Sequence, residues 1–299
     1  MSPTLHNNNF DELSVVRAVT SLSRAGVRSP LNVERVKQWV KQFSTKEEKA
    51  LAWLILRNLI YRTNEQLLSS MRQALKLATI HFVTQQNKQD SVTWGDALKG
   101  DAGLTFLCGP PSLATSGSPT PPGKSGELIT RLINQRYRIG KHFPSDISVL
   151  EPEERFIVVD DGTYTGVQLV NFLNNWDIDF SKQRVAIAVA IAHENACEYI
   201  KQAFPNVPLF FGELLTPETC FKSLCQKWQD TQQWIYDKSP LEIYEDVHKR
   251  NQPFEKGSGA NGYGDIGALV AFEHGVPDDS IQLLWDTSEN WKPLIERGV

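Results

Sequence analysis

Apolar residues at helical spacing dominate the first third of the chain. In the segment that Asn32 opens, apolar side chains recur every three or four positions. Ser44-Thr45-Lys46-Glu47 has the form of a capping box, with Glu47 three residues after the expected cap at Ser44. It leads into a segment from Ala50 to Tyr61 that is apolar on most sides, and such helices are normally buried between neighbours. Residues 11 to about 86 therefore predict a small N-terminal helical bundle.

Beyond Gly103 the pattern changes to continuous apolar runs that alternate with helical segments. The expected strands are Leu104 to Cys108, Phe156 to Val159, Arg184 to Ala192 and Leu209 to Phe211. The expected helices between them are Glu127 to Tyr137, Val167 to Trp176 and Glu194 to Phe204. Continuous apolar strands that alternate with helices are typical of a parallel sheet covered on both faces. The sequence thus predicts an α/β fold.

Stretches rich in glycine, proline and serine separate these regions. Residues 109–123 form one such stretch, which is expected to be a loop. A Gly-rich loop from Gly257 to Gly267 precedes two further apolar runs, 268–272 and 281–285. We therefore expect three consecutive parts. They are an N-terminal helical region (1–100), an α/β core (101–240) and a C-terminal hood or cap segment (241–299).

Composition and charge limit the function classes. The 299 residues are 40% hydrophobic, which is enough for a sizeable core, and they carry a formal net charge of −4. That charge gives no bulk electrostatic argument for binding nucleic acid or an anionic membrane, although a local basic patch is compatible with it. The four cysteines are scattered, without the paired spacing of a zinc site. We expect them to be idle thiols in a reducing cytosol.

The sequence carries no signal of a membrane protein. The first ten residues are polar, whereas a signal peptide has an apolar centre. Apolar runs such as Ala50 to Leu56 are far shorter than the roughly 20 residues that a membrane span needs. We expect a soluble, cytoplasmic protein that does not bind a membrane.

The segment Phe156 to Leu169, FIVVDDGTYTGVQL, carries the clearest chemistry. An apolar strand ends in Asp160 and Asp161 (the acid pair), and a short loop of glycine and threonine then opens a helix. Ligands of open parallel sheets lie beyond the carboxyl ends of the strands, and the amides of a helix N-terminus favour a phosphate. The two carboxylates can accept hydrogen bonds from vicinal hydroxyls or contact a ligand-bound metal. A sugar phosphate has a phosphate for the helix N-terminus and hydroxyls for the two carboxylates. The alternative interpretation is an ordinary turn that binds no ligand.

This segment resembles the 5-phosphoribosyl 1-diphosphate (PRPP) motif of type I phosphoribosyltransferases. The shared pattern is four apolar residues, two acidic residues, three variable positions and Thr-Gly. The resemblance implies that Asp160 and Asp161 are catalytic residues that hold the ribose hydroxyls. It also implies a phosphate-binding group, which consists of Thr163, Tyr164, Thr165, Gly166 and Gln168. The family usually has Thr or Ser where this chain has Gln168, so one hydroxyl contact to phosphate is missing.

The same resemblance extends to the region before this strand and to the fold. It implies a type I phosphoribosyltransferase-like parallel sheet core, with the N-terminal helical bundle and a small C-terminal hood added to it. It also implies a pyrophosphate loop, which consists of Gly109, Lys124, Ser125 and Gly126. In this interpretation the diphosphate of PRPP binds there together with Mg²⁺, which is held mainly through PRPP and in addition by the acid pair. A solvated, Pro-rich loop is the alternative.

Gly-Lys-Ser after a strand also suggests a P-loop NTPase. That motif needs a glycine where this chain has Ser118. In addition, Pro119, Pro121 and Pro122 lack the amide donors that a phosphate cradle requires. We therefore disfavour an NTPase.

Other candidates carry weaker signals. A basic stretch that could neutralise the diphosphate of PRPP, or lie in solvent, consists of Arg136, Arg138, Lys141 and His142. Aromatic residues that could stack an acceptor base, or belong to the core, are Tyr263, Phe272 and Trp285. Polar residues at the expected site edge or in a C-terminal turn are His193, His274, Asp278 and Asp279.

A wider resemblance covers most of the chain. The Lys-Ser-Gly start at 124–126, the acid-pair loop and the C-terminal patterns GDIGALV (264–270) and HGVPDD (274–279) are similar to one family. It is the phosphoribosyltransferase-like family associated with bacterial conflict systems, including some retrons. The resemblance implies an anti-phage effector or toxin-like role, beside a partner such as a reverse transcriptase with its nucleic acid. Assembly with copies of itself, as a homo-oligomer, is open.

These observations favour a pentosyltransferase that uses PRPP. The expected reaction is displacement of pyrophosphate at C1 of PRPP by an acceptor that the sequence does not name, whether nucleobase, nucleotide or nucleic acid. One alternative is a non-catalytic module that senses PRPP or a nucleotide, which Gln168 and the Pro-rich loop favour. Another is an interaction protein whose helical N-terminal region docks a partner.

Overall fold

The computed structural model describes residues 12–85, 105–108, 125–137, 155–175 and 184–296. The chain divides into two compact units. Unit 1 consists of Met1–Asn64 and Thr216–Val299, and unit 2 consists of Glu65–Leu215. These boundaries differ from those of the three consecutive segments expected from the sequence, because the N-terminal helices share a core with the C-terminal segment. The two units are described separately below.

Unit 2 is built on a four-stranded sheet in which every pair of neighbours is parallel, with the order β2-β3-β4-β5. The strands are β2 (Thr105–Cys108), β3 (Arg155–Thr163), β4 (Arg184–His193) and β5 (Leu209–Leu215). Residues 185–193 of β4 are all buried, as expected for a strand covered on both faces. The parallel α/β sheet predicted from the continuous apolar runs is therefore confirmed.

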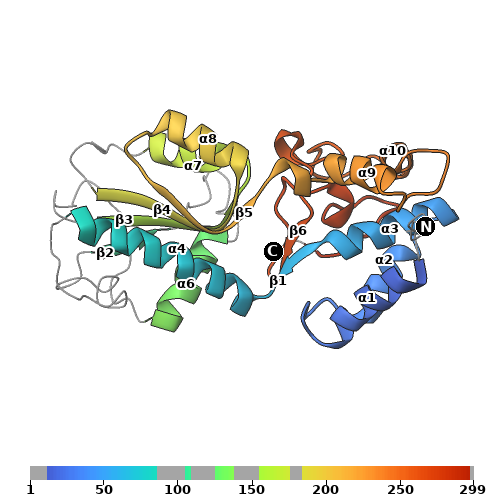
Figure 1. Ribbon diagram of the computed structural model, residues 1–299, viewed down its shortest axis with the longest axis horizontal. Helices are drawn as coiled ribbons and strands as arrows, with labels where there is room; N and C mark the ends of the chain where they lie inside the picture. Colours follow the sequence, from blue (N-terminus) through green and yellow to red (C-terminus); the bar gives the residue numbers. More distant parts are fainter. Residues whose placement is uncertain (1–11, 86–104, 109–124, 138–154, 176–183, 297–299) are drawn as a thin grey trace, which may run out of the picture. The chain divides into compact units, whose positions relative to one another are not determined.

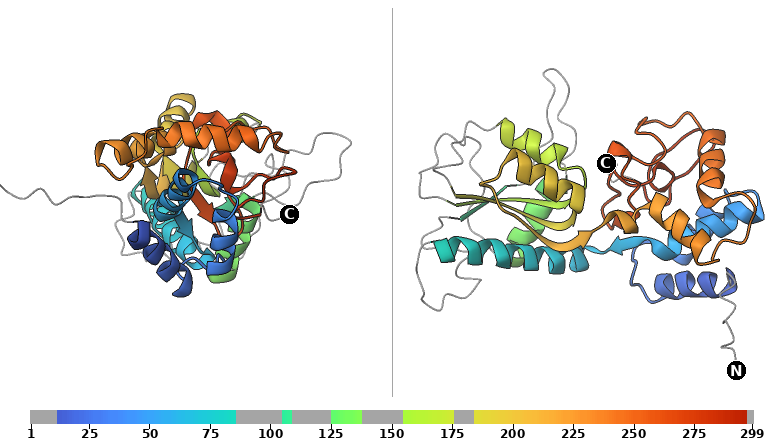
Figure 2. Two further views of the ribbon diagram at one scale, coloured as in Figure 1. Left: turned by 90° about the vertical axis from the view of Figure 1, so that its right-hand side faces the viewer. Right: turned by 45° about the horizontal axis from the view of Figure 1, so that its top comes forward.

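Helices cover both faces of this sheet. They are α4 (Asn64–Gln85), α6 (Ser125–Tyr137), α7 (Val167–Asn174) and α8 (Glu194–Ala203). The views in Figures 1 and 2 show α7 and α8 on one face and α4 and α6 on the other. Within the described ranges, no helix of the protein combines the length and the apolar character needed to cross a membrane.

Strand β3 extends further than the sequence suggested. The sequence predicts an apolar run up to Val159, the acid pair at the end of the strand, and a loop directly after Asp161. In the structure β3 continues to Thr163, and Gly162 and Thr163 are still paired with Ile191 and Ala192 of β4. The reason is that β4 is a long apolar strand that provides backbone partners for the whole length of β3. The acid pair therefore lies within the strand, and the loop begins at Tyr164.

Unit 1 brings the N-terminal helices together with the C-terminal segment. Its helices are α1 (Glu12–Arg24), α2 (Val33–Val40), α3 (Lys46–Asn58), α9 (Phe221–Asp230) and α10 (Pro240–Arg250). Short 3₁₀ turns are η3 (Pro217–Thr219), η4 (Tyr263–Asp265) and η5 (Gln282–Leu284). Two short parallel strands, β1 (Ile60–Arg62) and β6 (Val270–Phe272), pair with each other. Helices α1, α2 and α3 contact one another, as expected for the N-terminal bundle. The last helix predicted for that bundle is α4, which belongs to unit 2 instead and covers its sheet, so the bundle is shorter than predicted.

An aromatic cluster joins the two segments of unit 1. The rings of Trp39, Phe43 and Trp291 lie edge to face, with centroids 4.9–6.0 Å apart. The indole nitrogens of Trp39 and Trp291 both donate to the carbonyl oxygen of Leu283, at 3.1 and 3.0 Å. Both tryptophans are fully buried, so this cluster forms the centre of the core.

The N-cap of α3 is one residue later than predicted. The cap is Thr45, whose hydroxyl accepts a hydrogen bond from the amide of Glu48 at 3.2 Å. The Glu48 carboxylate in turn accepts from the amide of Ser44 at 2.6 Å. The expected pair of Ser44 and Glu47 is therefore wrong by one position, because Glu48 rather than Glu47 faces the core and forms the buried contacts.

Candidate functional site

The acid pair occupies the carboxyl end of β3, next to the centre of the sheet of unit 2. Asp160 is paired in register with Val189 of β4. Both carboxylates are largely removed from solvent, with 3% exposure for Asp160 and 8% for Asp161. The carboxyl ends of parallel strands are where open α/β sheets bind their ligands. The location therefore agrees with a binding site.

The start of α6 contacts the acid pair directly. The hydroxyl of Ser125 donates to Oδ1 of Asp160 at 2.8 Å, and the backbone amide of Asp161 donates to the same oxygen at 2.9 Å. Helix α6 packs on β3 and β2, which places its first turn beside the end of the sheet. The structure thus brings together two segments that the sequence separates by 35 positions.

Two adjacent, buried negative charges are energetically unfavourable, so the acid pair has a free-energy cost when both carboxylates are ionised. Burial raises the pKa of Asp160 well above its ordinary value, and the negative charge of Asp161 raises it further. The hydrogen bonds from Ser125 and from the Asp161 amide act in the opposite direction and are outweighed. Hydroxyl donors or a cation at this position would relieve the repulsion between the two carboxylates.

Two glycines determine the course of the chain after the acid pair. A Cβ atom at Gly162 would lie 2.9–3.1 Å from the ring and hydroxyl of Tyr164, so the absence of a side chain lets this ring fold back. Gly166 has φ of 78°, in the left-handed region, and a Cβ there would lie 3.2 Å from the carbonyl oxygen of Ala196. Gly166 therefore combines a backbone requirement with a close approach to α8.

The loop leads directly into the N-terminus of α7. Gly166 occupies the N-cap position, and the hydroxyl of Thr165 accepts a hydrogen bond from the amide of Val167 at 3.4 Å. Thr163 is buried, Thr165 is half-buried, and Gln168 is exposed in the first turn of the helix. The first amides of a helix have no partners within the helix and attract anions. This arrangement suits a phosphate, whereas Gln168 offers an amide where the motif has a hydroxyl.

Not all predicted residues gather at this site. Gly126 is buried in the first turn of α6, next to Ser125. Arg136 lies in the last turn of the same helix, roughly 16 Å further along its axis at 1.5 Å per residue. It is therefore not beside the acid pair. The other predicted members of the pyrophosphate loop and the basic stretch lie outside the described residues, namely Gly109, Lys124, Arg138, Lys141 and His142.

The acceptor-side candidates lie in unit 1. Tyr263 is exposed by 48%, so its ring faces solvent. Trp285 is only 3% exposed, and its indole nitrogen donates to the carbonyl oxygen of Ser280 at 3.1 Å, so the core of unit 1 encloses its ring. Phe272 is buried in β6 and stacks on His274 with an interplanar angle of 2°. The rings of Phe272 and Trp285 serve packing in unit 1, and the role of the C-terminal segment as a hood stays a prediction.

Three polar candidates, His193, Asp278 and Asp279, have local structural roles. His193 ends β4 and caps α8, because its Nδ1 accepts a hydrogen bond from the amide of Asn195 at 3.1 Å. The carbonyl oxygens of Asp278 and Asp279 accept from the amides of Tyr263 and Ala268, at 2.7 and 3.1 Å. The turn thus holds the Gly-rich loop in place through its backbone.

Sequence reasoning missed two features of the site. One is the hydrogen bond from Ser125 to Asp160, which joins the expected pyrophosphate loop to the acid pair. The other is the close approach of the Tyr164 ring to the backbone of Gly162. A glycine two residues before an aromatic residue was the sequence signal that could have indicated it. Among the described residues, no cluster of three or more His, Cys, Asp or Glu side chains could hold a metal ion without further ligands.

Comparisons with known proteins give one family match and several similar solved structures. The family model described as PRTase-CE matches residues 36–297. The similar solved structures include a xanthine-guanine-hypoxanthine phosphoribosyltransferase from Helicobacter pylori, with 10% identity, a TM-score of 0.27, and coverage of 52% of this chain and 84% of that chain. They also include the AQ2163 protein from Aquifex aeolicus, with 15% identity, a TM-score of 0.27, and coverage of 63% and 85%.

These structural similarities are too low to carry an assignment, and no curated protein matches the chain. The family match is different, because it spans almost the whole chain from α2 to the C-terminal segment. The parallel sheet with helices on both faces agrees with it. The chain belongs to the PRTase-CE family and contains a phosphoribosyltransferase-like domain.

Proposed function

We propose that the carboxyl end of β3 binds PRPP and that the protein transfers its phosphoribosyl group to an acceptor. The observation that carries this proposal is the buried acid pair, Asp160 and Asp161, followed at once by a Gly/Thr loop at the N-terminus of α7. Membership of the PRTase-CE family supports the same substrate class. The acceptor is a nucleobase, a nucleotide or a nucleic acid.

Different residues of the site would bind different parts of PRPP. Asp160 and Asp161 would accept hydrogen bonds from the two ribose hydroxyls. These hydroxyl donors would relieve the repulsion between the two carboxylates. The loop amides from Tyr164 to Gly166 and the first turn of α7 would bind the 5′-phosphate. In the reaction a bond forms between the acceptor and C1 of the ribose. The bond from C1 to the diphosphate oxygen breaks, and its electron pair leaves with pyrophosphate.

Mg²⁺ fits this site as a companion of the substrate. The acid pair supplies two adjoining carboxylates, which is fewer ligands than a magnesium site formed by protein alone would have. Asp160 and Asp161 would therefore contact a cation that the diphosphate of PRPP mainly holds. Bound there, Mg²⁺ would offset the negative charge of the leaving pyrophosphate. Ser125, at the start of α6, would position Asp160 for this contact.

The wider sequence resemblance supports a proposal for the cellular role. We propose that the protein is a cytoplasmic effector of a bacterial anti-phage defence system of the retron type. Its partner would be a reverse transcriptase with its nucleic acid, and the effector itself would assemble as a homo-oligomer. The support for this role is the similarity of the motifs at 124–126, 160–166, 264–270 and 274–279.

A second candidate is a module that binds PRPP or a nucleotide without turning it over. Two observations favour it. Gln168 is exposed in the first turn of α7, where the motif has a hydroxyl residue that binds phosphate. In addition, Oδ1 of Asp160 already accepts two hydrogen bonds within the protein, from Ser125 and from the Asp161 amide. Binding without release of pyrophosphate distinguishes this candidate from a transferase.

Calorimetric titration of the full chain with PRPP and Mg²⁺ tests the shared part of both candidates. We expect saturable binding that requires Mg²⁺ and exceeds the binding of ribose 5-phosphate. The variant D160N/D161N should bind PRPP at least about tenfold more weakly, since one charged hydrogen bond is worth about 1.5–3 kcal/mol. Asp237→Asn, at an exposed position in unit 1, is the matched control and should bind as the wild type does. Equal affinities of D160N/D161N and wild type would exclude this site.

Measurement of pyrophosphate release then separates the two candidates. The protein is mixed with PRPP, Mg²⁺ and, in separate reactions, nucleobases, nucleotides and single-stranded nucleic acid. Release that depends on one acceptor, and that D160N/D161N abolishes, identifies a transferase and its acceptor class. Binding of PRPP without release for any acceptor favours the sensing module.

A further inference from the structure

A pocket of about 390 Å³ lies between α4 and α6 in unit 2. It is separate from the acid pair, because it involves the last turn of α6, whereas Asp160 contacts the first turn. Its lining residues are Glu65, Leu68, Ser69, Arg72, Arg136 and Tyr137. Small-molecule sites in proteins are of this size.

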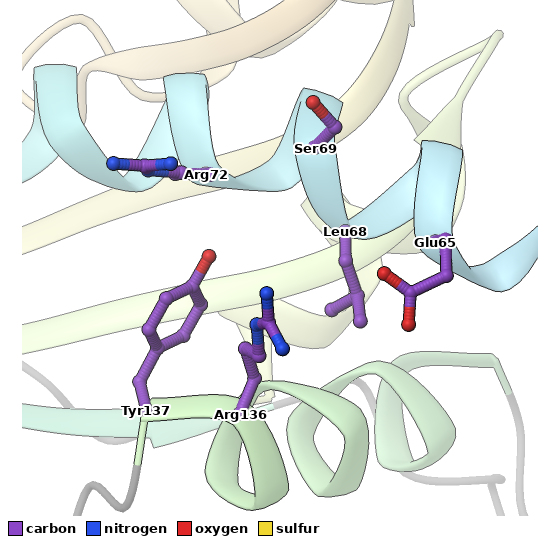
Figure 3. A pocket seen from close by; sticks show the side chains of 6 residues that line it. All are labelled: Glu65, Leu68, Ser69, Arg72, Arg136 and Tyr137. Atoms are coloured by element: carbon purple, nitrogen blue, oxygen red, sulfur yellow. The ribbon is translucent and has the colours of Figure 1, made fainter.

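The two helices contribute complementary groups to the pocket. Figure 3 shows Arg136 and Tyr137 extending from α6 towards α4, while Leu68 and Glu65 extend from α4 towards α6. Arg72 lies on α4 on the same side of the pocket as the hydroxyl group of Tyr137. The pocket therefore combines two guanidinium groups, a phenol and an apolar side chain.

Positive charge prevails in this pocket. It holds two guanidinium groups and one carboxylate, that of Glu65. In the part of the chain that the structure describes, Arg136 takes part in no ion pair, and its side chain is exposed. An arginine that faces a pocket and forms no ion pair keeps all five of its N–H donors for a ligand.

The environment of Tyr137 agrees with this distribution of charge. Burial raises the pKa of its phenol, the guanidinium groups of Arg72 and Arg136 lower it, and Glu65 raises it. The net direction is upwards, so the hydroxyl keeps its proton at neutral pH and can donate a hydrogen bond. The same effects locate Tyr137 within the electrostatic reach of all three charged residues.

We propose that this pocket binds a phosphorylated small molecule, with Arg72 and Arg136 at the phosphate and Leu68 and Tyr137 against its organic part. Arginine forks match the oxygens of a phosphate in a bidentate manner and bind it more strongly than neutral donors do. The phenol adds a hydroxyl donor, and Glu65 provides an acceptor for hydroxyl or amino groups of the ligand. The inference does not depend on the proposed function of the acid pair.

Titration of the full chain with ADP and, separately, with inorganic phosphate tests the proposal. We expect ADP to bind and Arg136→Gln to weaken it at least about tenfold, which is the loss of one charge-assisted contact. Arg131→Gln is the matched control, because Arg131 is exposed on the same helix and does not line the pocket. Arg72→Gln is the second variant and should weaken binding in the same way. Binding of ADP that Arg136→Gln and Arg72→Gln leave unchanged would overturn the proposal.

The acid-pair variant distinguishes this pocket from the proposed PRPP site. D160N/D161N should bind ADP as the wild type does, whether or not that variant has lost PRPP. Similar affinities for ADP and phosphate would assign recognition to the phosphate alone, and a clear preference for ADP would add the contacts of Leu68 and Tyr137. Both results support the pocket. The absence of binding for both probes, or its loss in D160N/D161N alone, would refute it.

Discussion

Glu48 in unit 1 and Asp160 in unit 2 are both buried carboxylates, but they have different neighbours. The Glu48 carboxylate, in a residue only 5% exposed, accepts hydrogen bonds from both terminal nitrogens of Arg250, at 2.7 and 2.9 Å, and from the amide of Ser44 at 2.6 Å. Burial alone would raise the pKa of Glu48, but the hydrogen bonds from Arg250 and Ser44 outweigh it and lower the pKa. Asp160 instead lies beside a second carboxylate, and its pKa is raised.

The difference separates a structural carboxylate from a candidate ligand-binding one. Glu48 is matched by a cation and an amide, and its contacts join two segments that are 202 positions apart in the sequence. Oδ1 of Asp160 accepts from a hydroxyl and an amide, and the charge of Asp161 beside it still raises the pKa of Asp160. Buried groups with such a residual cost concentrate at functional sites. The candidate ligand chemistry therefore belongs to unit 2.

The largest effect is expected from Glu48→Gln. Its amide group would face the donors of Arg250 with a donor of its own, and the bidentate ion pair would be lost. We expect the free energy of unfolding to fall by about 2–3 kcal/mol, less than for a fully buried pair because the Arg250 side chain is 44% exposed. Chemical denaturation followed by circular dichroism measures this value.

Glu47→Gln serves as the control, because Glu47 precedes Glu48 in the same helical turn and is only half-buried. It should change stability by less than about 0.5 kcal/mol. The lowered pKa also fixes the pH dependence of the Glu48 contribution. The stabilisation is present above the pKa of the unfolded chain and is lost as the pH falls through the folded pKa. Equal stabilities of the two variants at neutral pH would contradict the structural role of Glu48.

Gly166→Ala probes the loop that follows the acid pair. An alanine at φ of 78° costs about 1–2 kcal/mol in backbone energy, and its Cβ would also crowd the carbonyl oxygen of Ala196. We expect a loss of roughly 2 kcal/mol in stability, together with weaker PRPP binding. Gly257→Ala is the control, because Gly257 has φ of 64° but has open space where a Cβ would lie. If both variants lost the same stability, the close approach to α8 would have no energetic importance.

Local patterns in the sequence were sufficient to predict the elements of unit 2. The apolar runs at Phe156 and at Arg184 predicted β3 and β4, and their continuous character predicted the parallel sheet. The acid-pair motif could be located for the same reason, because strand, loop and helix follow one another within a few residues. Such features depend on neighbours in the sequence, so a single chain reveals them.

Contacts between distant segments could not be predicted in this way. No local pattern indicates that Glu48 meets Arg250, or that Trp285 is enclosed in a core shared with the N-terminal helices. The length of β3 also depended on its partner, since β4 pairs with it as far as Thr163. Arg136 was expected near PRPP because of its charge, but the length of α6 separates it from the acid pair.

Asp160→Asn should have a smaller effect on stability than the two changes above, and of opposite sign. The side-chain oxygen of asparagine can still accept from Ser125 and from the Asp161 amide, while the charge next to Asp161 is removed. We expect the free energy of unfolding to rise by about 1 kcal/mol at neutral pH, even though PRPP binding falls. Denaturation and titration of the same preparation measure both quantities. A clear loss of stability would show that the Asp160 charge supports the fold.

The pH dependence of this gain separates charge repulsion from packing. Because the pKa of Asp160 is raised in the folded state, its proton is held more tightly there than in the unfolded chain. The contribution of Asp160 to stability is therefore fully present below the unfolded pKa and is lost as the pH rises through the folded pKa. Asparagine does not titrate, so the advantage of Asp160→Asn should be smallest in acid and grow towards neutral pH. An advantage that is the same at every pH would show that the gain comes from packing. That result would contradict the charge repulsion within the acid pair, which is the feature that distinguishes it from Glu48.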